Sequence, residues 1–319
     1  MTVSALRSAT LISAERVGGF NEDLYLLKPS KSLDPSVAVA LIHLFRDGSI
    51  TRKPPVLLWH GMFGNHRYFS GDNGQGIAQK LAANGFDVWI ADWRGHGFSP
   101  QNTEFMSNSV WRFVDYDLPA IASFIAEQND IKPRLIGADI SGLMLLAAVS
   151  MSKLPLGGES LTVLMDRKSD ILASLSSSIF SKKSQWRWKS QGSVAPQMVG
   201  FGKEPEAFEL VRSAVKWLIG GEKFKSKNEL MCLSMAASEL PCLILENKGL
   251  SNESETLLNW IAKNKPNTFV SRMDTDPSVY DGGFEGLSRA FNHPESGIWA
   301  DLHPWLSGDY SFVRKQQAG

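Results

Sequence analysis

Short, mainly apolar runs recur along the chain and divide it into regular segments. They cover residues 56–59, 87–91, 134–137, 161–165, 240–246 and 268–273. Continuous apolar runs of this length are typical of strands that are buried on both faces of a parallel sheet. Two earlier segments, residues 23–27 and 36–45, are rich in Val, Leu, Ile and Tyr and flank a turn cluster, so they are also predicted as strands.

Helix-sized segments separate these predicted strands. Residues 76–84 end at Gly85, which is a good helix stop, and residues 114–129 and 142–153 form two longer helical segments. Strands that alternate with helices predict βαβ units with right-handed crossovers. The expected fold class is therefore α/β, with a mostly parallel sheet flanked by helices.

The alternation is lost between residues 167 and 236. This segment contains the Ser- and Lys-rich stretch SLSSSIFSKKSQ and an amphipathic helix near residues 206–219. Because strands resume afterwards, we interpret residues 1–166 and 237–319 as one core and residues 167–236 as an insertion. Segments that follow strands lie at the carboxyl end of a parallel sheet, where ligands bind. The insertion is interpreted as a cap or lid over a site, and helices that merely pack on the core are the alternative.

Composition narrows the class of protein. The 33 basic and 33 acidic residues cancel, whereas a nucleic-acid binder usually has a basic excess. Two cysteines, Cys232 and Cys242, are too few for a disulfide scaffold. The first residues of the chain lack the apolar core of a signal peptide, and no stretch reaches the ~20 apolar residues that a bilayer span needs. We expect a cytoplasmic protein with no membrane span, no nucleic-acid partner, and no cofactor or metal.

Residues 137–142, Gly-Ala-Asp-Ile-Ser-Gly, close a predicted strand and open a predicted helix. This is the context of a nucleophile elbow, G-x-S-x-G, in which small residues permit a sharp turn. The central position holds Asp139 instead of serine. Ser141 stands in place of the second glycine and is interpreted as a small packing residue, not as a displaced nucleophile. Because elbows are strained, we predict a positive φ at Asp139.

Two further loops follow predicted strands. Residues 60–65, His-Gly-Met-Phe-Gly-Asn, are partly small and let backbone N–H groups point at one spot, as an oxyanion hole requires. Residues 92–99 allow a tight turn, in which Arg94 and His96 are interpreted as residues that hydrogen-bond the loop. The candidate residues of the substrate pocket are His60, Phe63 and Trp93.

The candidate base is His293. It lies in the segment Phe-Asn-His-Pro at residues 291–294, after the last predicted strand, and a loop there can reach back to the elbow. The remaining five histidines fall in an early strand, in other loops or in a predicted terminal helix. The order of strand, elbow, acid and histidine along the chain favours His293 for this role.

Together these segments resemble the α/β-hydrolase superfamily, and more narrowly its acid-lipase branch. The resemblance is carried by WHGMFGN (59–65), LAANGFDVWIADWRGHGFSP (81–100), DYDLPAIASFI (115–125), IGADISG (136–142) and FNHPESGIWAD (291–301). It implies a central eight-stranded sheet, a cap after the sixth strand and ester hydrolysis by a Ser-His-Asp triad. Carried over, His293 matches the family histidine, and the amides of Met62 and Ile140 match the family's oxyanion hole.

The chain departs from that family pattern at two positions. Asp139 replaces the serine nucleophile. The family acid normally follows the seventh strand, yet residues 246–253 contain no aspartate. Asp166, directly after the sixth predicted strand, is the alternative acid, and Glu246 is a second choice. Beside Arg167 and Lys168, Asp166 is equally well interpreted as a strand-end ion pair.

An elbow carboxylate changes the reaction class. Attack of an aspartate on an ester would give a mixed anhydride, which is a poor intermediate. Attack on a saturated carbon gives an alkyl ester, which histidine-activated water can cleave. Dehalogenases and epoxide hydrolases of the superfamily work in this way. The first hypothesis is a hydrolase of a small to medium apolar substrate, with Asp139 as nucleophile, His293 as base and Asp166 orienting the base.

Two alternatives stay open. A degenerate member that binds an apolar or acyl ligand, or a partner, without turnover would explain both replaced triad positions. A weak esterase that uses Asp139 as a base on water is the other. The supporting groups of the first hypothesis are incomplete, since the insertion has no tyrosine to protonate a leaving oxygen and Ile140, not tryptophan, follows Asp139. The tryptophans that could hold a halide instead are Trp59, Trp93, Trp186 and Trp188.

Overall fold

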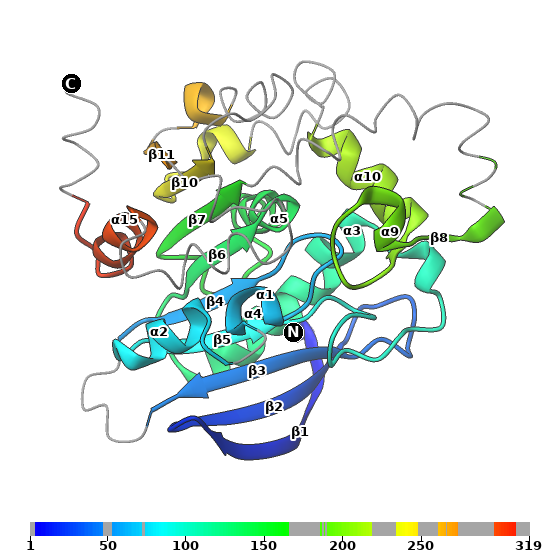
Figure 1. Cartoon of the computed structure of the whole chain (residues 1–319), viewed down its shortest axis with the longest axis horizontal. Coiled ribbons are helices and arrows are strands. Elements are labelled where there is room, and N and C mark those ends of the chain that lie inside the picture. The colour runs from blue at the N-terminus through cyan, green and yellow to red at the C-terminus, as the bar shows by residue number, and fades with distance from the viewer. Residues whose placement is uncertain are drawn as a thin grey trace.

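One mixed sheet forms the centre of the molecule. The computed structural model describes residues 4–46, 53–71, 74–165, 186, 188, 190–218, 234–247, 261–265, 267–273 and 297–310. In this part of the chain the sheet has nine strands in the order β1-β2-β3-β5-β4-β6-β7-β10-β11 (Figure 1). Strands β1 to β3 run antiparallel to their neighbours, and the remaining strands pair in parallel. The mostly parallel α/β sheet predicted from the sequence is confirmed.

The first strand is the one that the sequence pattern missed. The strands are β1 (Leu6–Val17), β2 (Phe20–Pro29), β3 (Val39–Phe45), β4 (Pro55–Trp59), β5 (Asp87–Ala91), β6 (Arg134–Ala138), β7 (Ser160–Met165), β10 (Cys242–Asn247) and β11 (Thr268–Met273). Ten of the twelve residues of β1 are exposed, so this edge strand carries no apolar stripe. It brings the described sheet to nine strands where eight were expected.

The apolar runs are continuous because each central strand faces two cores. In β4, Leu57 and Trp59 belong to one buried cluster, and Val56 and Leu58 belong to the other. The first cluster lies against α4 (Leu118–Gln128), α5 (Ile140–Ser150) and α10 (Phe208–Leu218). The second lies against α2 (Ile77–Ala83) and α15 (Gly297–Leu306). Helices therefore cover both faces of the sheet, as Figure 1 shows.

Residues 190–218 are the continuous described part of the predicted insertion. They contain the two-stranded sheet of β8 (Ser193–Val194) and β9 (Glu206–Ala207), the short helix α9 (Pro196–Val199), and α10. The amphipathic helix predicted in this region is confirmed as α10. Its apolar side chains belong to the same buried cluster as the sheet and α5, so this segment packs directly on the core.

The remaining short elements occur in the chain segments that connect β4 to β5 and β5 to β6. They are α1 (Arg67–Ser70), the 3-10 turn η1 (Phe105–Ser107), α3 (Val110–Arg112) and the π-helical turn η2 (Phe113–Asp117), which leads into α4. Among the described residues, no helix is long and apolar enough to cross a membrane.

The register of the central strands brings three loops to one edge of the sheet. Trp59, at the end of β4, lies beside Ala91 at the end of β5 and beside Gly137 in β6. The chain segments that follow these strands are therefore neighbours. They are the loop of residues 60–65, the loop of residues 92–99 and the predicted elbow.

The packing of α10 yields a first prediction. Leu210 is 1% exposed within the main core cluster, so Leu210→Ala is expected to lower the free energy of unfolding by ~2–5 kcal/mol. Urea denaturation followed by circular dichroism measures this change. The exposed Lys216 on the same helix provides the control, since Lys216→Ala is expected to change stability by at most ~0.5 kcal/mol. An unchanged midpoint for Leu210→Ala would mean that α10 is not part of the cooperative core.

Candidate active site

Asp139 occupies a sharp turn between β6 and α5. Its backbone has φ 51° and ψ −123°, so the predicted positive φ is confirmed. The Asp139 N–H donates to the carbonyl of Leu164 on the neighbouring strand (2.8 Å), and its own carbonyl accepts from Gly142 (3.1 Å). The turn is thus tied both to the sheet and to the first turn of the helix, which holds the side chain at the carboxyl edge of the sheet.

Two glycines make this turn possible. A Cβ atom on Gly137 would lie 2.4 Å from the backbone nitrogen of Gly142, and a Cβ atom on Gly142 would lie 2.5 Å from Cγ1 of Val163. Such contacts are too short for real Cβ atoms, so α5 can approach β6 at Gly137 and the neighbouring β7 at Gly142 only because these side chains are absent. The spacing of the small residues around Asp139 is therefore a packing requirement of the elbow.

Ser141 has a structural role in the same turn. It is fully buried, its hydroxyl donates to the carbonyl of His60 (2.5 Å), and it accepts from the Trp93 indole N–H (3.2 Å). The hydroxyl links α5 to the loops after β4 and β5. This agrees with the interpretation of Ser141 as a packing residue.

The Asp139 carboxylate lies against the loop of residues 60–65. A Cβ atom on Gly61 would lie 2.8 Å from Asp139 Oδ2, so only glycine leaves room for the carboxylate at this point. Asp139 and Met62 are each 3% exposed, and Ile140 is fully buried at the start of α5. The first amides of a helix have no partner within the helix and lie at the positive end of its dipole. The structure therefore brings together the elbow, the segment that carries Met62, and the helix start at Ile140.

His60 is a neutral hydrogen-bonding residue beneath this loop. Its Nδ1–H donates to the carbonyl of Gly61 (2.8 Å), and its Nε2 accepts from the Trp93 N–H (3.0 Å). Burial lowers the pKa of His60 to about 3, although the neighbouring Asp92 acts in the opposite direction. The structure places His60, Phe63 and Trp93 in the interior, each at most 1% exposed. Lining of a substrate pocket by these three residues stays a prediction.

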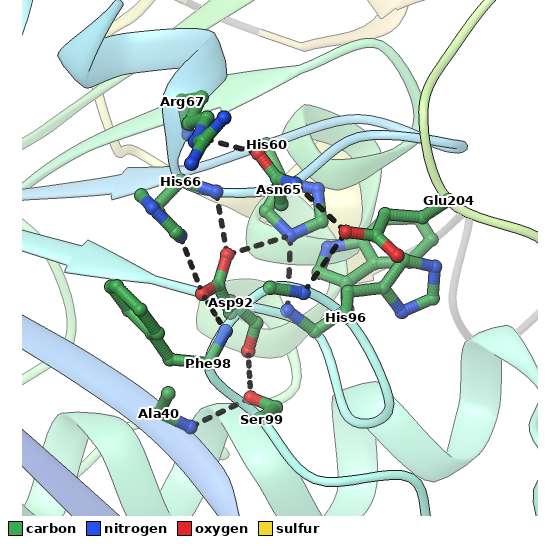
Figure 2. A network of polar contacts seen from close by, with 12 residues as sticks. Ala40, His60, Asn65, His66, Arg67, Asp92, His96, Phe98, Ser99 and Glu204 are labelled. Atoms are coloured by element: carbon green, nitrogen blue, oxygen red, sulfur yellow. Dashed lines mark hydrogen bonds and ion pairs between the residues drawn. The ribbon is translucent and has the colours of Figure 1, made fainter. Parts of the chain in front are cut away.

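Asp92 organises the loop that follows β5 (Figure 2). Its carboxylate accepts hydrogen bonds from the backbone N–H of His66 (2.5 Å), the His66 ring (2.8 Å) and the backbone N–H of Phe98 (2.9 Å). Burial by itself raises the pKa of Asp92, but these hydrogen bonds and the adjacent histidines outweigh it and bring the pKa below its ordinary value. A Cβ atom on Gly97 would lie 2.3 Å from Asp92 Oδ2, so the loop closes tightly around an anion.

His96 forms a buried ion pair with the insertion. Its Nε2 lies 3.3 Å from Glu206 Oε1, and its Nδ1–H donates to the carbonyl of Arg94 (3.1 Å). Both side chains of the pair are fully buried. Burial lowers the pKa of His96, but the Glu206 carboxylate has the larger combined effect and raises the pKa to about 9. His96 is therefore a protonated structural residue at neutral pH, in line with the loop role expected for it.

Arg94 holds the same loop from its other side. Its Nε donates to Asp117 Oδ2 (2.7 Å), and its Nη2 donates to Asp117 Oδ1. The guanidinium also lies over the Phe113 ring, 5.5 Å from its centroid. Bidentate pairs of this kind fix orientation as well as charge. Arg94 thus anchors the loop to η2.

The structure describes only some of the remaining residues that were predicted for the site. His293 and Asp166 lie outside the described residues. Glu246 is 5% exposed near the end of β10, where it is paired in register with Met165, the last residue of β7. Among the candidate tryptophans, Trp59 lies against Trp93 beneath the loop of residues 60–65. Trp188 packs on Phe208, and Trp186 is 77% exposed.

The titratable side chains around these loops pair with one another in the described residues. No group of three His, Cys, Asp or Glu side chains there is arranged to hold a metal ion. Glu206 and Glu204 are the residues of this region that the sequence did not reveal. They lie in the insertion, more than 100 positions from the loops they contact, and the segment that carries them has no recognisable motif.

Comparisons with known proteins agree with this geometry. Residues 54–155 match the family model described as the alpha/beta hydrolase fold. Human lipase member K is 31% identical over 93 residues, which cover 27% of this chain and 23% of the lipase. Rat gastric triacylglycerol lipase is 32% identical over 89 residues, which cover 25% of this chain and 22% of that lipase. The match thus spans about a quarter of these curated relatives.

A solved structure extends the likeness to most of the chain. A loop variant of a haloalkane dehalogenase from Bradyrhizobium elkanii aligns with a TM-score of 0.56 and 14% identity, covering 92% of this chain and 99% of the dehalogenase. The chain therefore has the α/β-hydrolase fold. The family match covers residues 54–155, and an aspartate, Asp139, occupies the elbow of this fold.

The buried pair of His96 and Glu206 generates a pH prediction. Because the pKa of folded His96 is about 9, above the ordinary value of 6.5, the pair contributes stability that is fully present below about pH 6.5 and is lost as the pH rises through about 9. The thermal unfolding midpoint is expected to fall over this range, and Glu206→Gln is expected to flatten the fall. Differential scanning fluorimetry measures both.

The matched control for this measurement is Glu209→Gln. Glu209 also lies in the insertion but forms a partly exposed pair with Arg212, so its replacement is expected to leave the pH dependence of the midpoint unchanged. Parallel curves for the unmodified chain and Glu206→Gln would contradict a charged His96 in the folded state.

Proposed function

We propose that the protein is a hydrolase that uses Asp139 as a nucleophile on an apolar substrate. The observation that carries this proposal is the positive φ of Asp139 at the turn from β6 to α5. A residue other than glycine in such a conformation stores ~1–3 kcal/mol of strain, and strain of this kind clusters at functional sites. The strained turn places the Asp139 carboxylate at the position where the G-x-S-x-G elbow has its serine.

The proposed reaction has two steps. In the first, an oxygen of Asp139 attacks a saturated carbon, a C–O bond forms, and the leaving group departs with the electron pair of the broken bond. In the second, His293 takes a proton from water, and the resulting hydroxide attacks the carbonyl carbon of the ester. The tetrahedral intermediate collapses, the C–O bond to the alkyl group breaks, and the alkoxide leaves as an alcohol with the proton that His293 took up. Asp139 is formed as a carboxylic acid and loses its proton to solvent to restore the carboxylate, while Asp166 orients His293 throughout.

The contacts of Asp139 support the second step. The carboxylate lies beside Gly61, and the negative charge of the tetrahedral intermediate develops on one of its oxygens. Backbone N–H groups that face such an oxygen stabilise it without reorganisation. Met62 follows Gly61 directly, and Ile140 begins α5, so the amides of these two residues are the proposed donors. The insertion, residues 167–236, is the proposed cap that encloses the substrate.

Ester hydrolysis is the second candidate function. The observation that favours it is the identity of 31–32% to lipases over 89–93 residues. In this case Asp139 would act as a base on water rather than as the attacking atom. A protein that binds an apolar or acyl ligand without turnover is the third possibility.

A trapping experiment tests the nucleophile. In His293→Gln the base of the second step is absent, so an ester on Asp139 is expected to accumulate. The variant is incubated separately with a haloalkane, an epoxide, a lactone and a simple ester, and intact-protein mass spectrometry with peptide mapping locates any added mass. The double variant His293→Gln, Asp139→Asn is the control. Added mass at another residue, or in the double variant as well, would contradict the proposal.

A second experiment tests whether the site is assembled. Asp139→Ser restores the side chain that related hydrolases use at the elbow. We expect it to hydrolyse p-nitrophenyl acetate at least ~100-fold faster than Asp139→Ala, since alanine supplies no nucleophile and loss of the serine of an assembled triad costs well over ~100-fold in kcat. Equal rates for the two variants would favour the binding protein without turnover.

A further inference from the structure

The segment of residues 203–206 binds both backbone polar groups of Phe63, in the loop of residues 60–65. The Phe63 N–H donates to Glu206 Oε1 (2.7 Å). The Phe63 carbonyl accepts from the backbone N–H groups of Lys203 (2.8 Å) and Glu204 (3.2 Å). Phe63 is fully buried. A segment of the insertion thus supplies three hydrogen bonds to the residue that directly follows Met62.

Phe63 has a conformation that needs such support. Its φ is +59°, in the left-handed region, which is costly for a residue with a Cβ atom. Rotation of the peptide between Met62 and Phe63 would let Phe63 return to a negative φ. The same rotation would turn the Phe63 N–H away from Glu206 and break their hydrogen bond. Glu206 therefore opposes the relaxation of a strained residue.

The approach of the insertion to Phe63 is a close backbone contact. A Cβ atom on Gly202 would lie 2.3 Å from Phe63 Cβ and 2.7 Å from the Phe63 carbonyl oxygen. The Phe63 ring packs edge-on against Phe201, with 5.4 Å between the ring centroids. The loop and residues 201–206 therefore fit closely, with Gly202 against the Phe63 backbone and Phe201 against the Phe63 ring.

Electrostatic interactions, in addition to close packing, hold residues 201–206 against the loops. Glu206 is fully buried, and the cation that faces it is His96 at 3.3 Å. Glu204 Oε1 accepts from Asn65 Nδ2 (2.8 Å) and from the Gly97 N–H (3.3 Å), and Figure 2 shows Glu204 between the two loops. The two glutamates thus join the loops that follow β4 and β5 to each other through the insertion.

We propose that Glu206 is a positioning residue for the oxyanion loop. By fixing the Phe63 N–H it holds the peptide plane that joins Met62 to Phe63. This restrains the backbone of Met62 on one side, and with it the preceding peptide, which carries the proposed oxyanion donor, the Met62 N–H. This inference rests on the proposed function, in which the Met62 amide stabilises an oxyanion on the elbow residue.

The experiment uses the Asp139→Ser variant and diethyl p-nitrophenyl phosphate as the probe. Labelling of the elbow hydroxyl releases p-nitrophenol and builds negative charge on a phosphoryl oxygen, so its rate reports on the oxyanion donors. Adding Glu206→Ala is expected to lower the labelling rate constant at saturation about 100-fold, while the half-saturating probe concentration stays unchanged. Adding Glu206→Gln, which keeps an oxygen acceptor for Phe63, is expected to restore most of the rate.

A second measurement is independent of reactivity. Amide hydrogen exchange of the peptide that spans residues 60–66, in the chain with Asp139 intact, is expected to accelerate in Glu206→Ala and to change little in Glu206→Gln. Gly202→Ala presses on Phe63 without removing a charge, and it is expected to lower the labelling rate in the Asp139→Ser variant. Glu209→Ala is the control for both measurements.

The outcomes separate the two proposals. If the Asp139→Ser variant labels but Glu206→Ala does not slow labelling, the positioning role is wrong and the proposed site stands. The same conclusion follows if hydrogen exchange is unchanged in Glu206→Ala. If the Asp139→Ser variant does not label while exchange responds to Glu206→Ala, Glu206 holds the loop, and the oxyanion site of the proposed function is wrong.

Discussion

The site depends on the close contact between β6 and α5. Two glycines, Gly137 and Gly142, let a strand and a helix meet with almost no space between them, and the chain can pass through that contact only by a turn at Asp139. The turn fixes the direction of the carboxylate and places the start of α5 beside it. Because a parallel sheet aligns the ends of neighbouring strands, the loops after β4 and β5 meet the elbow at the same edge.

Buried charged side chains fix the conformation of the loops around the elbow. Taking a single charge out of water is costly, so a buried ion requires a partner and further hydrogen bonds. The loop after β5 meets this requirement at each of its charged residues, with Asp117 for Arg94, His66 for Asp92 and Glu206 for His96. His60 meets it differently, because it stays neutral between a donor and an acceptor. The histidines of these loops, His60, His66 and His96, are thus paired within the scaffold, and the proposed base, His293, comes from elsewhere in the chain.

Sequence reasoning succeeded where a local pattern had a single physical meaning. The glycines around Asp139 predicted the elbow and its positive φ, and the apolar runs predicted the central strands, since both depend on neighbours in the chain. It failed for β1, whose exposed residues have no apolar stripe, and for Glu206, whose partners Phe63 and His96 are distant in sequence. The sequence alone does not distinguish a buried glutamate from an exposed one. The burial of Glu206 becomes visible only in the packing of residues 190–218 on the loops.

The docking of the insertion limits how such a protein can diverge. A chimera that carried the corresponding segment of another hydrolase would leave His96 as a buried imidazolium without its anion and the Phe63 amide without its acceptor. Exchange of residues 190–218 is therefore expected to require compensating changes at Phe63 and His96. A related chain that keeps His96 and a left-handed residue at the position of Phe63 is therefore expected to keep an acidic residue at the position of Glu206.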